Sequence, residues 1–521
     1  MNILLFAELE KTMAYFKPLS GPGKKAAENL SYLCEKERSL TVLKSVKTAF
    51  EFSRKKKISA DKIKYHLKRI PLLPQTEIFG QTEIFLIKRF LNNSKAICAS
   101  LTEKEKKVFS LSFDLQELLD KISADSSSDE FFISDDYSPA LAEVRRKIKD
   151  LEQKEKKAKK EFYSKIYARY GLDFSGKDFL VIDSDSAVKS GDLIYFEPHD
   201  NFSFLAKPIF TQELTEIIFE KEKNLKKEKE IETEILQKLG EHIKENRHKI
   251  ERLCDSIALT DLAFAGADMA LTLGLKEPKL GNKRIECKEA FFPPLKNRLE
   301  ADKIRYTPLT FKFDENINII KGSNMGGKTV VLKTLALCQV LAQMGLFVPA
   351  REYKAPFFSS IFFLGDKEQS GLSSFGCEIN DLIEVLKEKK EPYLIFSDEF
   401  AKTTDSFQAC ALLSSLIRFF SKEKAYFFAA THLSGLPKEL PAAFLSMRGF
   451  DSSKYSADKN KSYLKISERL KEINKHMDYT LIKLSEEKRT QDALAVAQIL
   501  GLDGKILEFA KEYLDSHNKK N

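Results

Sequence analysis

The hydrophobic pattern changes most clearly past the middle of the chain, where long charged stretches give way to short apolar runs. Three such runs, at residues 317–320, 393–397 and 426–430, have the length and composition of buried strands in a parallel sheet. Apolar residues at helical spacing follow the first run, and Gly345 predicts the end of that helix. Strands that alternate with helices indicate an α/β domain, which we place at residues 291–460.

The first part of the chain is predicted to be almost entirely helical. Residues 1–135 are expected to form an all-α core, in which apolar positions recur every three or four residues over 26–52. Pro71 and Pro74 interrupt this pattern. The acidic, serine-rich residues 123–136 are typical of an exposed linker that closes the core.

Residues 136–290 combine long charged helices with a small β-rich insertion. The predicted tip of β-strands occupies about 178–207 and separates the two charged helices. These helices are expected at 141–170 and 211–257, followed by an Ala/Leu-rich buried helix at 261–275. Because two long helices around a tip bury little surface by themselves, we expect antiparallel arms that project and move.

The tail, residues 461–521, is predicted to be helical. Helical patterns lie around 462–473, 491–500 and 505–514, and the last two are separated by a glycine-containing turn at 501–504. A helix, a short turn and a helix form a helix-turn-helix arrangement. Its many alanines favour packing or dimerisation, and insertion into a DNA groove is the alternative.

Composition narrows the class of protein without identifying a partner. The 521 residues include 86 Lys and Arg against 77 Asp and Glu, a formal net charge of +9 that permits nucleic acid as a partner without requiring it. The seven cysteines form no C-x-x-C pair, which is typical of free thiols in a reducing cytosol. No run reaches the roughly 20 apolar residues of a membrane span. We therefore expect a cytoplasmic protein without a membrane partner.

The turn between the first predicted strand and its helix carries the strongest chemical signal. Its sequence has the form G-x-x-x-x-G-K-[ST], the P-loop pattern, in which glycines let backbone N–H groups surround a phosphate at a helix N-terminus. A glycine-rich turn that contains Lys-Thr by chance is the alternative, but the flanking strand and helix favour the P-loop. The residues expected to bind the nucleotide are Gly322, Ser323, Asn324, Met325, Gly326, Gly327, Lys328 and Thr329.

Each residue type in this motif has a distinct task. Lys328 is expected to reach the β- and γ-phosphates of ATP, and the Thr329 hydroxyl is expected to be a ligand of Mg²⁺. The second predicted strand ends in Asp398 and Glu399, which places two carboxylates where parallel strands deliver catalytic groups. We expect Asp398 to hold Mg²⁺ and Glu399 to polarise the attacking water.

A histidine follows the third predicted strand. Thr431-His432 comes directly after residues 426–430, where His432 can sense the γ-phosphate or position the water. A single histidine is more often structural, but its place at the tip of a third such strand favours a catalytic role. Together with Lys328 and Glu399, it predicts the core of a nucleotide hydrolase.

Several of these motifs together resemble the MutS family. The Asn-Met-Gly-Gly-Lys core within 322–329 is much narrower than a general P-loop pattern, and 345–350 is similar to the family's segment after the first helix. Residues 365–375 resemble its signature loop, and 495–502 resembles its terminal helix-turn-helix. The charged arms resemble the family's levers and clamp. This resemblance runs from about residue 15 to the end and is most specific in the α/β domain.

The resemblance implies a homodimer, or a MutS-like heterodimer, with composite ATPase sites of the ABC type. In the family a signature serine contacts the γ-phosphate bound by the other subunit, which implies this role for Ser373, or for the adjacent Ser374, with Phe375 as the aromatic of the loop. Tyr306 or Ile304 would contact the adenine. Hydrolysis would then change the dimer's geometry and act on the clamp.

The sequence also departs from the family pattern. We expect neither a mismatch-reader nor a connector domain, since the helical core pattern starts near residue 15, and no nuclease domain before Asn521. After Glu399 the chain lacks the family's glycines, and Lys402 stands where Arg is common. This predicts slower or differently coupled hydrolysis.

These observations lead to a mixed fold: an all-α core, lever helices with a small β clamp, an α/β P-loop ATPase and a C-terminal helix-turn-helix. The predicted function is an ATP- and Mg²⁺-dependent clamp that acts on branched or recombination DNA rather than on mismatches. The alternative partner is a cobalamin-dependent amino-acid mutase, because some MutS-like proteins resemble the ATPase component of reactivases for enzymes of the lysine 5,6-aminomutase type. A third interpretation, an inactive nucleotide-gated scaffold, is disfavoured because all the catalytic positions are filled.

Overall fold

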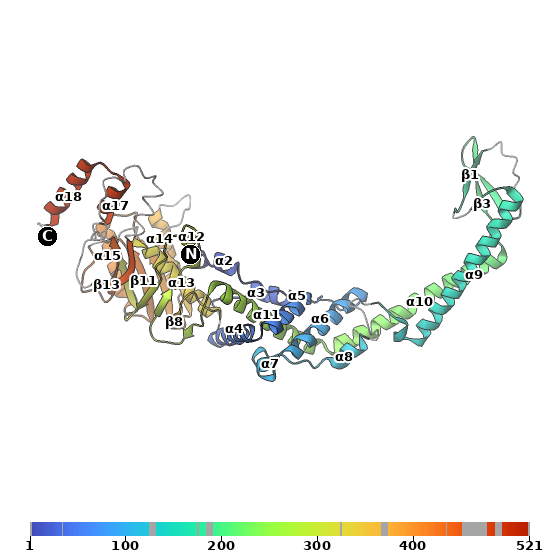
Figure 1. The fold of residues 1–521 in the computed structure, drawn as a ribbon, viewed down its shortest axis with the longest axis horizontal. Coiled ribbons are helices and arrows are strands. Elements are labelled where there is room, and N and C mark those ends of the chain that lie inside the picture. The colour runs from blue at the N-terminus through green and yellow to red at the C-terminus, as the bar shows by residue number, and fades with distance from the viewer. Residues whose placement is uncertain are drawn as a thin grey trace. The chain divides into compact units, whose positions relative to one another are not determined.

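The structure is a computed structural model that describes residues 3–33, 35–123, 132–174, 177–183, 191–322, 326–365, 374–433, 435–450, 477–484 and 492–518. The chain divides into two compact units, each assembled from separated segments (Figure 1). The first unit comprises Met1–Lys68, Ile97–Leu111 and Asp255–Asn521, and the second comprises Arg69–Ala96 and Ser112–Cys254. The fold is mixed, with long helices and three separate sheets.

A six-stranded sheet forms the centre of the first unit, with strand order β13-β12-β7-β11-β10-β9. All neighbouring strands pair in parallel except β13, which is antiparallel to β12. The three strands expected from apolar runs are present as β7, β10 and β11, whereas β9, β12 and β13 were not predicted. The strands are β7 (Ile317–Lys321), β9 (Ser360–Leu364), β10 (Tyr393–Asp398), β11 (Ala425–Thr431), β12 (Ala443–Phe450) and β13 (Met477–Lys483).

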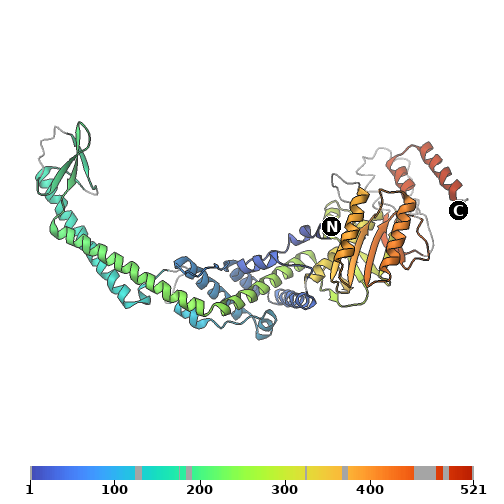
Figure 2. The same ribbon diagram turned by 180° about the vertical axis from the view of Figure 1, so that it is seen from behind.

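Helices cover both faces of this sheet, as alternating buried side chains require. Phe396 and Phe428 belong to the core that contains α13 (Lys328–Gln343), while Ile395 and Phe427 belong to the core on the opposite face. That second core is closed by α14 (Ser374–Glu388) and α15 (Ser406–Phe420), which Figure 2 shows in orange beside the strands. Because both faces are covered, the strands are apolar throughout and lack a polar alternation.

A four-stranded sheet of order β4-β8-β5-β6 lies in the same unit and was not predicted. Its strands are short and rich in charged residues, so they contain no apolar run. Some of these residues form ion pairs between strands, such as Lys288 of β5 with Glu352 of β8 at 2.7 Å. Its strands are β4 (Lys279–Leu280), β5 (Glu286–Ala290), β6 (Leu309–Lys312) and β8 (Glu352–Ala355), and the short helix α12 (Pro293–Ala301) separates β5 from β6.

The N-terminal segment packs against the six-stranded sheet and its first helix. Phe6, at the end of α1 (Ile3–Phe6), stacks on Phe363 of β9 with ring centroids 3.7 Å apart. Glu8 then accepts a hydrogen bond from the Lys333 ammonium of α13 at 2.7 Å. The helix α2 (Leu9–Met13) follows. The first residues of the chain are therefore built into the α/β layer.

The predicted continuous helix over 26–52 is wrong. The structure has α3 (Gly21–Glu28) and α4 (Lys36–Lys55), with a connecting segment between them. Leu30 in that segment packs against the main core, which explains why an apolar residue at helical spacing lies outside any helix. The next helices in the chain are α5 (Lys57–Arg69), α6 (Gln81–Ser100), α7 (Glu103–Phe109) and α8 (Gln116–Lys121).

The predicted arms appear in the second unit as α9 (Pro139–Tyr170) and α10 (Gln212–Glu245), which run side by side (Figures 1 and 2). The tip between them is a three-stranded sheet of order β1-β3-β2. Two of its strands match predicted β-rich pieces, and β3 was not predicted. The strands are β1 (Leu180–Asp183), β2 (Ile194–Pro198) and β3 (Ser203–Pro208).

The prediction of one helix over 211–257 is also wrong, because α10 ends at Glu245 and α11 (Arg247–Leu273) begins after Asn246. The Asn246 side chain donates to the carbonyl of His242 at 2.9 Å and so caps the first helix. Among the described residues, α11 alone is long and apolar enough to cross a membrane, contrary to the expectation that no stretch reaches that size. Since 67% of its apolar window is buried, α11 is better described as a core helix.

The tail contains α17 (Asp492–Leu500) and α18 (Gly504–Asn518). Val496 and Ile499 of α17 form a small core with Met477 of β13. The helix predicted around 462–473 lies outside the described residues. Six of the seven cysteines are described and are free thiols, as expected.

Candidate functional site

Strand order brings the predicted chemistry to one edge of the six-stranded sheet. β11 lies between β7 and β10, with Thr431 opposite Lys321 and Ala430 opposite Asp398. The residues that leave the carboxyl ends of these three strands are therefore neighbours, although up to 110 positions separate them in the sequence. Ligands of open α/β sheets bind at this edge.

The glycine-rich turn joins β7 to α13. Gly322 has φ of 144° and Gly327 has φ of 86°, and both values favour glycine because a Cβ strains the backbone there. A Cβ on Gly327 would also lie 3.1 Å from Cδ1 of Tyr479 on β13, so a side chain at position 327 would crowd this ring. Ser323, Asn324 and Met325 lie outside the described residues. Tyr479 was missed by sequence reasoning, since nothing in its surroundings resembles a motif.

Lys328 is the first residue of α13 and is 3% exposed. Its Nζ donates a hydrogen bond to the carbonyl of Gly322 at 2.7 Å, and it lies 4.0 Å from Oε1 of Glu399. Burial lowers the pKa of Lys328, against the opposing charges of Glu399 and Asp398. The ammonium is thus held inside the glycine-rich turn, with the Gly322 carbonyl as its neutral partner.

Thr329 and Asp398 meet at the start of α13 and the end of β10. The Thr329 hydroxyl donates to Oδ2 of Asp398 at 2.8 Å. The other oxygen, Oδ1, is buried and has no hydrogen-bond partner among the described residues. Burial raises the pKa of Asp398, and the neighbouring Glu399 charge raises it further, while the Thr329 hydrogen bond lowers it.

This pair fits a hard divalent cation. A buried carboxylate oxygen without a partner is costly, and coordination of a cation, directly or through water, would satisfy it. Among the residues that the structure describes, no group of three or more His, Cys, Asp or Glu forms a closed metal cage. Of the described residues, the Thr329 hydroxyl and the Asp398 carboxylate would hold a magnesium ion here, which suits an ion that keeps water and phosphate ligands.

Glu399 lies between the other two candidate catalytic residues. Its Oε1 is 4.0 Å from Lys328 Nζ and 3.7 Å from Nδ1 of His432, which is half-exposed. The backbone of Glu399 has φ of 53°, a left-handed value that is unusual for a residue with a side chain. The structure thus brings together Lys328, Glu399 and His432, the three residues that the sequence predicted to be catalytic.

The two candidates for contact with the adenine, Tyr306 and Ile304, lie beside the short helix α12. The Tyr306 hydroxyl accepts a hydrogen bond from the Phe292 amide at 2.9 Å, at the start of α12. The Ile304 amide donates to the Leu299 carbonyl at 2.8 Å, so both adenine candidates are attached to this short helix. Ser373 lies outside the described residues, and Phe375 packs into the core beneath α14. Contacts of Tyr306, Ile304 and Ser373 with a nucleotide remain predictions.

Comparison with known proteins shows which family this region of the chain resembles. The profile of MutS domain V matches residues 318–516, which include the whole edge described above. This part of the chain is therefore similar to MutS domain V. It is 30% identical to Endonuclease MutS2 of Fusobacterium nucleatum over 300 residues, which cover 56% of this chain and 36% of that protein.

Two further relatives carry the same name. Endonuclease MutS2 of Carboxydothermus hydrogenoformans is 26% identical over 519 residues, which cover 95% of this chain and 59% of that protein. Endonuclease MutS2 of Thermus thermophilus is 28% identical over 320 residues, which cover 58% of this chain and 40% of that protein. The chain therefore spans about half the length of the curated relatives it matches.

Proposed function

We propose that this chain is a magnesium-dependent ATPase of the MutS family that uses its arms as a clamp. The observation that carries this proposal is the meeting of five side chains at one sheet edge. Thr329 is bonded to Asp398 at 2.8 Å, and Lys328 and His432 both lie beside Glu399. A structural ion-pair cluster would neutralise its charges without a glycine-rich turn at a helix N-terminus. The combination is typical of phosphoryl chemistry.

Each residue is assigned a role by its surroundings. The backbone of residues 322–327 cradles the phosphates, and the Lys328 ammonium exchanges the Gly322 carbonyl for the β- and γ-phosphate oxygens. Glu399 is the only one of these carboxylates that faces both Lys328 and His432, so it accepts a proton from the attacking water. His432 orients Glu399 and the water.

Thr329 and Asp398 would hold the magnesium ion. When bound, Mg²⁺ neutralises charge that develops on the phosphate oxygens. The Thr329 hydroxyl, which donates to Asp398 at 2.8 Å, fixes the orientation of this carboxylate before any ligand arrives.

Substitution of Lys328 tests the proposal. The purified chain should release phosphate from ATP only with magnesium, and Lys328→Ala should abolish nucleotide binding or lower phosphate release by about 100-fold or more. Lys288→Ala, which removes an exposed lysine of the four-stranded sheet, is the matched control and should keep the wild-type rate. Equal rates for Lys328→Ala and the wild type would remove the assignment.

Dimerisation is part of the proposal. In it, Ser373 of one subunit completes the site of the other, so ATP and magnesium should shift the chain from monomer to dimer. Sedimentation with and without ATP and magnesium measures this shift. If the chain stays monomeric at ATP concentrations above its dissociation constant for ATP, the proposal is reduced to a hydrolase that acts as a monomer.

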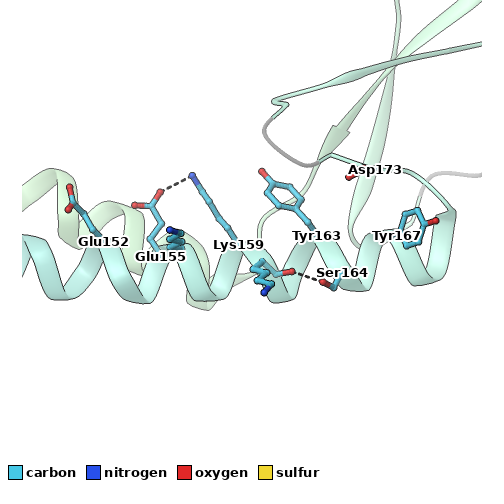
Figure 3. A pocket seen from close by; sticks show the side chains of 9 residues that line it. Glu152, Glu155, Lys159, Tyr163, Ser164, Tyr167 and Asp173 are labelled. Carbon is cyan, nitrogen blue, oxygen red and sulfur yellow. Dashed lines mark hydrogen bonds and ion pairs between the residues drawn. The ribbon is translucent and has the colours of Figure 1, made fainter.

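We further propose that DNA is the clamped partner, since the relatives are named endonucleases and α9 carries many lysines over 154–165. Figure 3 shows one side of α9, where Glu155 pairs with Lys159, so that lysine is already engaged within the protein. Other lysines of α9 are exposed and have no ion pair among the described residues: Lys154, Lys156, Lys157, Lys160 and Lys165. These five are the phosphate contacts that the proposal needs.

The salt dependence of DNA binding distinguishes DNA from the alternative partner. Branched DNA should bind with an affinity that falls steeply between about 50 and 200 mM salt, and changing the five arm lysines to Gln should flatten that slope. A matched control changes five exposed lysines outside the arm, Lys17, Lys24, Lys25, Lys44 and Lys104, and should keep the slope. No salt-dependent complex at low ionic strength would favour the alternative partner, a cobalamin-dependent aminomutase.

The four predicted domains, 1–135, 136–290, 291–460 and 461–521, and a cytoplasmic location complete the proposal. The tail helices α17 and α18 act in it as a packing or dimerisation element. Support for packing comes from Val496 and Ile499, which α17 buries against β13.

A further inference from the structure

The turn that carries Glu399 is strained. Glu399 has φ of 53° and Ala401 has φ of 60°, so two residues with side chains adopt left-handed backbone conformations within three positions. Such a residue is less stable than one in an ordinary backbone conformation, because its Cβ crowds the neighbouring carbonyl oxygen. Strain of this kind persists only where surrounding contacts hold the backbone in place.

Two hydrogen bonds hold this turn from opposite sides. The Glu399 amide donates to the carbonyl of Ala430 on β11 at 2.9 Å. The Ala401 amide donates to Oε2 of Glu378 at 2.6 Å. Glu378 comes from α14 and is 2% exposed, so its carboxylate is buried next to a backbone amide that no strand or helix would otherwise bind.

Apolar packing also joins the turn that carries Glu399 to α14. Phe400 and Ala401 are buried in the core that also contains Ile379 and Leu382 of α14. The next position, Lys402, donates its amide to the Glu399 carbonyl at 3.2 Å and closes the turn on itself. The turn and α14 therefore form one packed body, and the Glu378 carboxylate is its polar attachment.

We propose that Glu378 is a positioning residue for ATP hydrolysis: it holds the left-handed turn at Ala401 and so aims the Glu399 carboxylate between Lys328 and His432. This inference rests on the proposed ATPase function and goes beyond it, because Glu378 belongs to no motif. A carboxylate suits the task, since a charged acceptor makes a hydrogen bond about twice as strong as a neutral one. Without it, the turn relaxes toward right-handed backbone conformations, and Glu399 leaves the 3.7 Å and 4.0 Å positions beside His432 and Lys328.

Steady-state kinetics test the proposal. Glu378→Ala should lower kcat by about 10- to 100-fold while the ATP concentration for half-maximal rate and direct nucleotide binding change by less than about threefold. Glu378→Gln keeps the shape and an acceptor oxygen, so it should recover part of the lost kcat. A purely structural role would instead lower Tm and nucleotide binding together.

Two residues of the same helix serve as controls. Asp381 is as buried as Glu378 and lies one turn further along α14, so Asp381→Asn reports what loss of a buried charge in this helix does by itself. Glu384 is exposed, so Glu384→Gln reports the background. Neither control should reproduce a fall in kcat at constant nucleotide binding. An equal fall for Asp381→Asn would show that the effect belongs to the helix and would overturn the proposal.

A double-mutant cycle tests whether Glu378 affects hydrolysis through Glu399. If Glu378 acts through Glu399, then Glu378→Ala should lower kcat in the wild type but have no further effect in Glu399→Gln. Multiplicative losses in the double variant would overturn the proposal. If the wild type itself does not hydrolyse ATP, the proposed function fails; if it does and Glu378→Ala equals the wild type, only the present inference fails.

Discussion

Asp261 of α11 accepts hydrogen bonds from both the amide and the hydroxyl of Ser20, at 2.7 Å and 2.6 Å, across 241 positions of sequence. The amide of Leu19 donates to the same carboxylate at 3.0 Å. Asp261 is 1% exposed, and a Cβ on Gly23 would come within 2.0 Å of its Oδ2. One buried carboxylate therefore fixes the N-terminal segment to the long helix α11.

Substitution of Asp261 should destabilise the first unit. Asp261→Asn keeps an oxygen that can accept from Ser20, but it puts an NH₂ group where Oδ1 accepts from the Leu19 amide. An unsatisfied buried donor costs about 1 to 3 kcal/mol, and we expect a loss of that size in the free energy of unfolding. Denaturant titration of the full chain measures it. Asp268→Asn, which removes a partly exposed ion pair of the same helix with Lys64, is the control and should cost about 1 kcal/mol or less.

The same variant has a predicted pH dependence. Burial raises the pKa of Asp261 above its ordinary value of 3.8, against the hydrogen bonds from Ser20 and Leu19. A raised folded-state pKa means that the carboxyl's stabilising contribution is full below pH 3.8 and is lost as the pH rises through the folded-state pKa. The stability difference between the wild type and Asp261→Asn should therefore shrink from acid toward neutral pH. A difference that grows with pH would contradict this reading.

The contribution of Glu8 to stability should depend on pH in the opposite direction to that of Asp261. Burial works against its ionisation, but hydrogen bonds from Lys11 and Lys333 prevail and hold the pKa of Glu8 below its ordinary value of 4.5. Its contribution is thus present above pH 4.5 and lost as the pH falls through the folded-state pKa. Because the pair is partly exposed, Glu8→Gln should cost about 1 kcal/mol or less at neutral pH, and added salt should reduce that cost. Thermal unfolding at two pH values and two salt concentrations checks both statements.

Glu155 should control how firmly the two arms hold together. Its buried carboxylate pairs with Lys159 of α9 at 2.8 Å and with Lys221 of α10. Glu155→Gln leaves both ammonium groups without their charge partner, so amide hydrogen exchange should become faster in α9 and α10, while the rate of ATP hydrolysis by the isolated chain stays the same. Glu152→Gln, an exposed neighbour on α9, is the control. Exchange that is unchanged by Glu155→Gln would mean that apolar packing alone joins the arms.

Apolar runs made three strands of the six-stranded sheet predictable, namely β7, β10 and β11. The sequence analysis missed β9, although Ser360–Leu364 is also an apolar run, and other missed elements lack such runs. Ile317, Tyr393 and Phe427 lie in strands buried on both faces, where physics demands continuous apolar sequence. The four-stranded sheet is built from segments such as Glu286–Ala290, whose half-exposed residues look like loop sequence. The break between α3 and α4 was hidden because Leu30 is buried by a tertiary contact rather than by helical periodicity.

The candidate site was predictable where its residues share a motif with the strand ends. Lys328, Thr329, Asp398, Glu399 and His432 all follow apolar runs, so strand order alone brings them together. Glu378 was missed, because its bond to the Ala401 amide depends on how α14 packs and not on any local pattern. Tyr479 was missed for the same reason, since only the pairing of β13 with β12 places it beside Gly327.

The central claim is that Glu399 activates water for attack on ATP held at Lys328 and Asp398. Single-turnover hydrolysis by Glu399→Gln, measured beside equilibrium binding of ATP with magnesium, tests it most directly. We predict wild-type ATP affinity and hydrolysis slower by about 100-fold or more. Hydrolysis at the wild-type rate by this variant would contradict the claim and show that another group activates the water.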